Sequence, residues 1–236
     1  MRKLALISVA VLSLGAMAPE AAEARPGGCL KYGLGGAVAG HFAGRADPLH
    51  VHCRVNAGYL PEDHWLRDPA VGGGRLVGEG CHFVDLCSSI VGAPVATIAV
   101  QALGTGPRTL AGDSWVLTLT YADGSVAVIG YVASGSTRMA KERIEVHGGG
   151  RSAVIDDFRA HRLYGDARGG LIRTPSALAT QDKGHGAALD AALEFFRAGG
   201  DPPVPYARLL ETTRVTLMAR DALAGGRTST APLGAA

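Results

Sequence analysis

An acidic side chain and an imidazole stand one helical turn apart at the start of a predicted helix. The residues from Gly72 onward lead into a helix whose apolar positions recur at helical spacing: Phe83, Leu86, Cys87, Ile90 and Val91. Glu79 precedes His82 by three residues, and His82 lies on a different stripe of this helix. Because imidazole exchanges protons near neutral pH, His82 can accept or relay a proton from a ligand. The alternative is a structural histidine held by hydrogen bonds.

Two more histidines share one face of a predicted strand. Leu49 to Val55 alternates, so that His50, His52 and Arg54 lie opposite the apolar residues. Two imidazoles on one face are compatible with zinc, but neither a Cys-x-x-Cys pair nor a His-Glu-x-x-His helix accompanies them. We therefore expect no metal here and interpret this face as exposed to solvent or substrate.

The glycine-rich stretch 25–42 contains Gly33-Leu34-Gly35-Gly36, which invites comparison with a dinucleotide-binding turn. That fingerprint needs a strand before the turn, a helix after it and a doubly wound sheet around both. Here a region rich in strands of a different character follows directly. We therefore interpret residues 25–42 as a linker.

Strand patterns follow one another without an intervening helix. Their ranges are Ala96–Ala102, Trp115–Tyr121, Val126–Val132, Arg143–His147 and Ser152–Phe158. Asp123-Gly124 predicts a tight hairpin within this series. Successive hairpins build an antiparallel sheet, whereas parallel strands need longer crossovers. Since helical patterns return around Leu189 to Phe196 and again after Pro205, the sequence indicates an α+β fold.

The composition is that of a globular chain. With 236 residues, 47% of them hydrophobic, the chain can bury one substantial core. The formal net charge of +2 comes from dispersed Lys and Arg, so we expect no nucleic acid partner. Of the four cysteines, Cys81 and Cys87 fall in the helical apolar pattern, which favours small core residues over disulfides.

The two ends of the chain differ from the rest. Arg2 and Lys3 precede an apolar run from Leu4 to Ala18, and Ala22-Glu23-Ala24 offers a cleavage site. Residues 1–24 are therefore a candidate signal peptide, or else a non-native N-terminal extension. The run is shorter than the roughly 20 residues of a spanning helix, so we expect no membrane span. Residues 227–236 predict a flexible tail.

Four stretches, in order, resemble the C-terminal domain of the glucose-fructose oxidoreductase and inositol dehydrogenase (Gfo/Idh/MocA) family. They are Arg54 to Tyr59, Gly72 to Leu86, Lys141 to Val146 and Gln181 to His185. The resemblance extends over residues 43–226 and implies a substrate-binding and oligomerisation domain: an open, mostly antiparallel β-sheet with helices packed on one face. It also implies a cofactor, NAD or NADP, bound with the family's catalytic lysine in an N-terminal Rossmann unit that we expect this chain to lack.

The resemblance also implies site residues. The family's helix-borne catalytic histidine falls on His82, and Glu79 stands beside Gly78, the position of an aspartate in many members. It further implies substrate-binding roles for Arg54, Asn56, Asp182, Lys183 and His185. The alternative for these five is a solvent-facing strand end and a charged loop before a helix.

Two classes of function remain open. In the first, the chain is the C-terminal, substrate-binding portion of a cytoplasmic NAD(P)-dependent oxidoreductase that acts on a sugar or polyol. It would then be inactive alone or completed by a separate Rossmann-domain polypeptide, and form a homo-oligomer through its sheet. His82 would take the hydroxyl proton when the cofactor removes hydride from a secondary alcohol. In the second, it is an exported, periplasmic, non-catalytic domain that binds a sugar or dimerises.

Overall fold

The computed structural model describes residues 33–68, 70–106, 110–165, 172–175, 181–225 and 231–232. The candidate signal peptide 1–24 and Cys29 lie outside these ranges. The helices are α1 (Gly33–His41), α2 (Cys81–Val91), α3 (His185–Ala198) and α4 (Tyr206–Ala224). The strands are β1 (His50–Asn56), β2 (Val95–Ala102), β3 (Trp115–Tyr121), β4 (Val126–Val132), β5 (Glu142–Gly148), β6 (Arg151–Asp156), β7 (Ala160–Tyr164), β8 (Ile172–Pro175) and β9 (Ala231–Pro232).

The strands of the described residues form one open sheet in the order β8-β7-β6-β5-β1-β4-β3-β2-β9. β1 and β4 are parallel, and every other neighbouring pair is antiparallel. The parallel register pairs Val55 with Tyr131 and Asn56 with Val132. The two strands therefore end at the same edge of the sheet, and this edge carries the candidate site.

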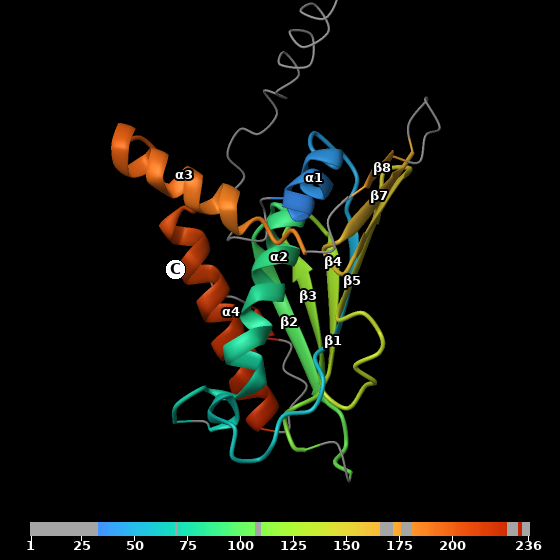
Figure 1. The fold of residues 1–236 in the computed structure, drawn as a ribbon, viewed down its shortest axis with the longest axis vertical. Helices are drawn as coiled ribbons and strands as arrows, with labels where there is room; N and C mark the ends of the chain where they lie inside the picture. The colour runs from blue at the N-terminus through green and yellow to red at the C-terminus, as the bar shows by residue number, and fades with distance from the viewer. Residues whose placement is uncertain are drawn as a thin grey trace, which may run out of the picture.

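The helices cover one face of the sheet, as expected. Figure 1 shows α2 and α4 lying side by side in front of the strands, and α1 beside the upper part of α2. The alternating residues of β3 and β4 point inward, so that Trp115, Leu117, Ile129 and Tyr131 are fully buried against α2. Together these features confirm the α+β fold with an open, mostly antiparallel sheet.

The opposite face of the sheet carries the intervening residues. His50 and His52 on β1 are exposed, and Val116 on β3 is 39% exposed. Among the described residues no group of three His, Cys, Asp or Glu side chains is arranged to hold a metal ion. Within the same ranges, no helix combines the length and apolar character needed to cross a membrane.

The predicted linker is wrong over residues 33–41, which form α1. Val38 and Phe42 are buried in the common core, and α1 packs against α2, β6 and β7. Its many glycines lower helix propensity, which is why the pattern indicated a loop. Burial of Val38 and Phe42 against the sheet outweighs that cost.

Two further boundaries differ from prediction. The strand expected over Ser152–Phe158 ends at Asp156, because Asp157 and Phe158 both adopt a φ of 51° in the turn to β7. Within the expected flexible tail 227–236, Ala231–Pro232 pairs with β2 as β9. In both places a tertiary contact decides the conformation: Phe158 is buried in the core, and β2 provides a free edge for β9.

Candidate functional site

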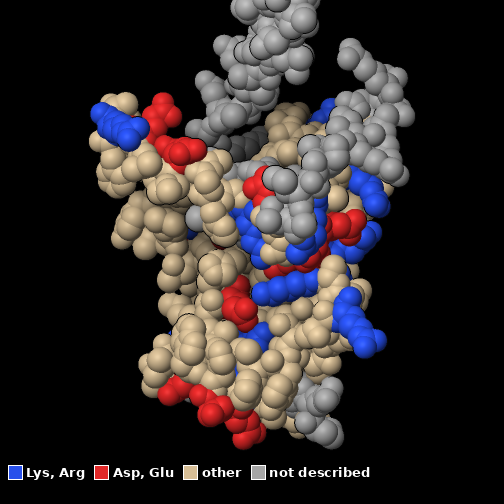
Figure 2. All heavy atoms as spheres, viewed as in Figure 1, with Lys and Arg blue, Asp and Glu red and all other residues tan. Residues whose placement is uncertain are grey.

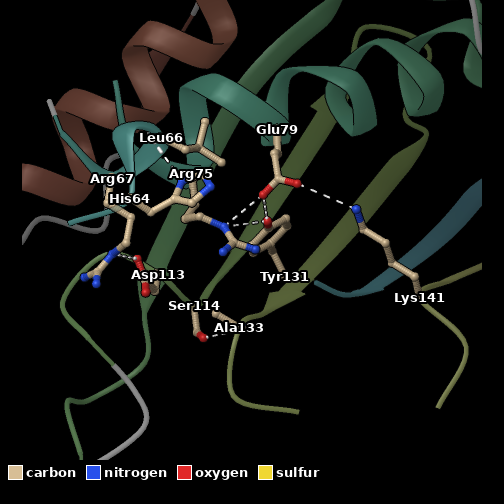
Figure 3. A network of polar contacts seen from close by, with 10 residues as sticks. All are labelled: His64, Leu66, Arg67, Arg75, Glu79, Asp113, Ser114, Tyr131, Ala133 and Lys141. Carbon is tan, nitrogen blue, oxygen red and sulfur yellow. Dashed lines mark hydrogen bonds and ion pairs between the residues drawn. The ribbon is translucent and has the colours of Figure 1, made fainter. Parts of the chain in front are cut away.

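A polar network centres on the hydroxyl of Tyr131, near the end of β4. Arg75 Nε donates to Tyr131 Oη over 2.9 Å and forms an ion pair with Glu79 Oε2 over 2.8 Å. Tyr131 Oη in turn donates to Glu79 Oε2. Lys141 Nζ lies 3.6 Å from Glu79 Oε1. Figure 3 shows Glu79 descending from the helix toward Tyr131, with Arg75 on one side and Lys141 reaching in from the other.

A short π-helical turn, Leu76–Gly80, places Glu79 in this network just before α2 begins. Such turns insert one extra residue into a helix and re-aim the side chains around it. A Cβ at Gly80 would lie 2.9 Å from the ring of Trp115, so this turn approaches the sheet more closely than a side chain would allow. Gly78 occupies the position at which the resemblance places an aspartate. A Cβ at Gly78 would collide with the side chain of Leu66, so a larger residue there would require Leu66 to move.

Aromatic packing holds the network in place. The rings of Trp115 and Tyr131 stack with centroids 4.8 Å apart, and the guanidinium of Arg75 lies 5.3 Å from the Tyr131 centroid. Arg75 is only 2% exposed, whereas the Glu79 side chain is 25% exposed. Glu79 thus neutralises a buried cation and still reaches the surface.

Burial raises the pKa of Tyr131 well above its usual range, and the hydrogen bond and charge of Glu79 raise it further. The phenol therefore remains protonated at physiological pH and donates to the carboxylate. This arrangement fixes the Glu79 carboxylate as an acceptor, with its second oxygen turned toward Lys141.

Beside this network lies a hollow of about 350 Å³ at the end of β1. Its wall includes Asn56, Lys141 and the preceding loop between β4 and β5, and Asp157 and Gln181 complete it. The amide of Asn56 donates to the carbonyls of Ser136 over 2.7 Å and Met139 over 3.4 Å. Asn56 therefore holds the loop that forms the wall.

A second ion pair supports the floor of this region. Lys183 Nζ lies 2.9 Å from Glu142 Oε1, and the Glu142 side chain is 1% exposed. The same ammonium lies 5.4 Å from the centroid of the Phe158 ring. These contacts connect the segment before α3 to the start of β5, through Glu142, and to the turn after β6, through Phe158.

Asp157 organises the same corner from the turn. Its Oδ1 accepts the backbone N–H groups of Lys141 and Glu142 over 3.1 and 3.3 Å, and its Oδ2 accepts from Arg159 over 2.9 Å. Burial on its own would raise the pKa of Asp157, but these hydrogen bonds outweigh burial and lower it. Asp157 is therefore ionised and holds Lys141 and the start of β5 in place.

The predicted site residues fall into distinct settings. His82 is exposed in the first turn of α2, and its ring makes no hydrogen bond or ion pair with the side chains of the described residues. Arg54 donates to the carbonyl of Ala140 over 3.0 Å. Asp182 accepts the N–H of Gly184 over 3.0 Å, and His185 begins α3 in an exposed position.

Two residues of the site, Tyr131 and Lys141, were not predicted from the sequence. Tyr131 fits the apolar alternation of β4, and nothing in the sequence connects it with Glu79, 52 positions earlier. Lys141 lies within a stretch that resembles the family, yet its direction is set by the loop before β5. A tyrosine buried in a strand beside a glycine-flanked acid is the one signal that could have indicated the network.

The glycine-rich start of α1 is not set in the doubly wound sheet that surrounds a dinucleotide-binding turn. α1 does begin at the glycines near Gly33, but it packs on α2 and on the antiparallel half of the sheet, without a parallel doubly wound sheet around it. The glycine turn therefore lacks the surroundings that bind a pyrophosphate.

Comparison with known proteins finds a domain family that is similar to part of this chain. Residues 46–154 match the GFO/IDH/MocA C-terminal domain. The matched residues contain β1, the π-helical turn with Glu79, α2, β4 with Tyr131, and Lys141 just before β5, so this part of the chain is similar to the Gfo/Idh/MocA C-terminal domain family. No curated protein matches the chain in sequence.

Solved oxidoreductases share the fold. An oxidoreductase domain protein from Kribbella flavida is 20% identical, with a TM-score of 0.68 over 85% of this chain and 62% of that one. An oxidoreductase from Agrobacterium radiobacter, in complex with NAD+, L-tartaric acid and magnesium, is 17% identical, with a TM-score of 0.63 over 82% and 59%. An aldose-aldose oxidoreductase from Caulobacter crescentus, complexed with glycerol, is 20% identical, with a TM-score of 0.60 over 78% and 56%. The chain thus spans less than two thirds of each of these proteins.

Proposed function

We propose that this chain is the substrate-binding part of an NAD(P)-dependent oxidoreductase that acts on a secondary alcohol of a sugar or polyol. The observation that carries the proposal is the hollow lined by Asn56, Lys141 and Gln181, where Lys141 also faces the carboxylate of Glu79. Hydroxyl-rich ligands need such a mixture of donors and acceptors in a concave site.

His82 is the proton acceptor in this proposal. Oxidation of a secondary alcohol releases the hydroxyl proton, and an imidazole is suited to receive it near neutral pH. The side chain of His82 is exposed, so its ring is accessible to a ligand. Glu79 does not hydrogen-bond to His82, so its role is to position Lys141 and the π-helical turn.

The remaining predicted residues divide between the ligand and the walls. Asp182, His185 and Arg54 lie at or near the surface and are proposed to contact substrate hydroxyls. Lys183 and Asn56 are held by Glu142 and by the loop carbonyls, so they shape the site from beneath.

The hydride acceptor is NAD or NADP, which supplies the redox chemistry when bound. The Agrobacterium relative in complex with NAD+ supports this cofactor. We propose that a separate Rossmann-domain polypeptide brings it and docks beside α3, whose Leu189, Leu193 and Phe196 are 60%, 40% and 81% exposed. We further propose a homo-oligomer through the open sheet face, where Val116 is exposed.

The binding role is tested by calorimetric titration of the chain with inositol and with glucose. We expect His82→Ala to weaken binding about tenfold, the order of one lost hydrogen bond to a ligand. His50→Ala, which alters an exposed histidine on the opposite sheet face, is the matched control. Unchanged binding by His82→Ala, or no binding by the unaltered chain, contradicts the proposal.

A further inference from the structure

The wall of the hollow beside Asn56 contains two cationic side chains that lack a close ion pair with a carboxylate of the described residues. The guanidinium of Arg138 is exposed on the loop between β4 and β5 and has no ion pair within the described ranges. The Lys141 side chain is 42% exposed and meets Glu79 only at 3.6 Å. Both residues line the hollow.

The carboxylates nearby are already neutralised. Glu79 accepts from Tyr131 and forms the shorter pair with Arg75, at 2.8 Å. Asp157 pairs with Arg159 at 2.9 Å, and Glu142 pairs with Lys183 at the same distance. Lys141 thus competes for a carboxylate that has two better partners, while Arg138 has no competing acceptor.

Figure 2 shows that charged side chains of both signs lie together on one face of the molecule. Lys and Arg side chains gather over the middle of the face that carries α2, with Asp and Glu side chains between them. The pairs at 2.8 and 2.9 Å cancel one another, and the charge left at the hollow is positive. Asp157 is the one carboxylate among the lining residues and is paired with Arg159, so Lys141 and Arg138 leave an excess of positive charge that attracts an anionic ligand.

The neutral part of the wall fits hydroxyl groups. Thr137 offers a hydroxyl that both donates and accepts, and Gln181, whose Nε2 already donates to Glu142 Oε2 over 3.4 Å, offers the remaining capacity of its amide. Both side chains are exposed. A ligand that pairs with Arg138 and Lys141 would therefore also find partners for several hydroxyls.

We infer that the hollow takes an acidic sugar, that is, a polyhydroxylated ligand with a carboxylate or phosphate group that pairs with Lys141 and Arg138. This inference rests on the proposed function and names the class of substrate. The anion would replace Glu79 as the closer partner of Lys141, because an exposed ammonium gains more from a ligand anion than from a carboxylate already shared.

The experiment is a calorimetric titration of the full chain with glucose, glucuronate and glucose 6-phosphate at low salt. We expect at least one of the two acidic ligands to bind about tenfold tighter than glucose, the order of two exposed ion pairs. A preference for glucuronate or for glucose 6-phosphate then identifies the anion as a carboxylate or a phosphate. Raising the salt should remove this advantage and leave glucose binding unchanged.

The double variant Arg138→Met and Lys141→Met should bind all three ligands equally. Arg214→Met, which removes an exposed cation from α4, should retain the preference. Equal affinity of the unaltered chain for glucose and both acidic sugars overturns the inference while leaving the proposed function in place. Binding of none of the three ligands overturns both.

Discussion

Glu79 is the residue on which the network depends, because it is the counter-charge of a buried guanidinium. Replacing it by glutamine leaves Arg75, which is 2% exposed, without an anion. We expect Glu79→Gln to lower the free energy of unfolding by about 2 kcal/mol, less than for a fully buried pair because Glu79 is partly exposed. Chemical denaturation measures this change.

The matched control is Glu145→Gln. Glu145 pairs with Arg143 over 2.7 Å, but both side chains are about a third exposed or more. Its loss should change the free energy of unfolding by less than about 0.5 kcal/mol. Equal effects of the two substitutions would show that burial of Arg75 does not make its ion pair special.

The raised pKa of Tyr131 makes the free energy of unfolding depend on pH in the alkaline range. Burial and Glu79 raise the pKa of this phenol in the folded state, so it stays protonated where an unfolded tyrosine ionises. A raised folded-state pKa gives stability that is complete below the unfolded value of about 10 and is lost as the pH rises toward the folded value. One such tyrosine contributes a decline of about 1.4 kcal/mol per pH unit.

Tyr131→Phe should remove this contribution, and urea denaturation from about pH 8 to pH 11 measures it. Burial also raises the pKa of Tyr121, so the variant should retain the part of the decline that Tyr121 causes. A decline as steep as in the unaltered chain would contradict the assigned role of Tyr131.

At the scale of elements, the loop between β4 and β5 depends on close contact with Asn56. A Cβ at Gly135 would collide with the Asn56 amide oxygen, whereas a Cβ at Gly130, on β4, meets no atom within 4 Å. We expect Gly135→Ala to cost about 1–3 kcal/mol and to weaken polyol binding, because the wall of the hollow moves. Gly130→Ala should be neutral or stabilise slightly, since glycine is unfavourable within a strand.

Denaturation and calorimetry on both glycine variants test this prediction. If Gly135→Ala retains the stability and the polyol affinity of Gly130→Ala, then Asn56 does not hold the loop in the way that its hydrogen bonds indicate.

The elements that could be predicted are those with a strong periodic pattern. Trp115–Tyr121 and Val126–Val132 have the observed bounds of β3 and β4, and Pro205 precedes α4 as expected. The helix α1 was missed because its glycines outweigh two buried apolar residues in any local pattern. The same limit applies to the turn at Asp157 and Phe158, where burial of Phe158 stabilises a backbone that phenylalanine rarely adopts.

The site was predictable only where resemblance pointed to it. His82, Glu79 and Asn56 lie on the expected elements. The sequence could not show that Asn56 is hydrogen-bonded to Ser136, 80 positions away, or that Lys183 is paired with Glu142, 41 positions away. Long-range pairing across the sheet sets these contacts. Tyr131 entered the site for the same reason.

At the scale of the molecule, one face of the sheet is covered by helices and the other face is exposed. The helix face contains the core, whereas the other face leaves Val116 exposed beside Thr118 and Thr120. If the proposed homo-oligomer uses this face, Val116→Arg should convert it to monomer without lowering the free energy of unfolding of the monomer. Sedimentation analysis decides this, with Leu209→Arg on the exposed side of α4 as the control.

The central claim is that this chain binds the substrate while the cofactor is held elsewhere. The most direct measurement is calorimetric titration of the purified chain with NAD and NADP, with and without inositol and glucose. We predict that the polyols bind, that His82→Ala weakens their binding, and that neither cofactor binds. Micromolar binding of NAD or NADP would contradict the claim and would mean that the chain contains a dinucleotide site of its own.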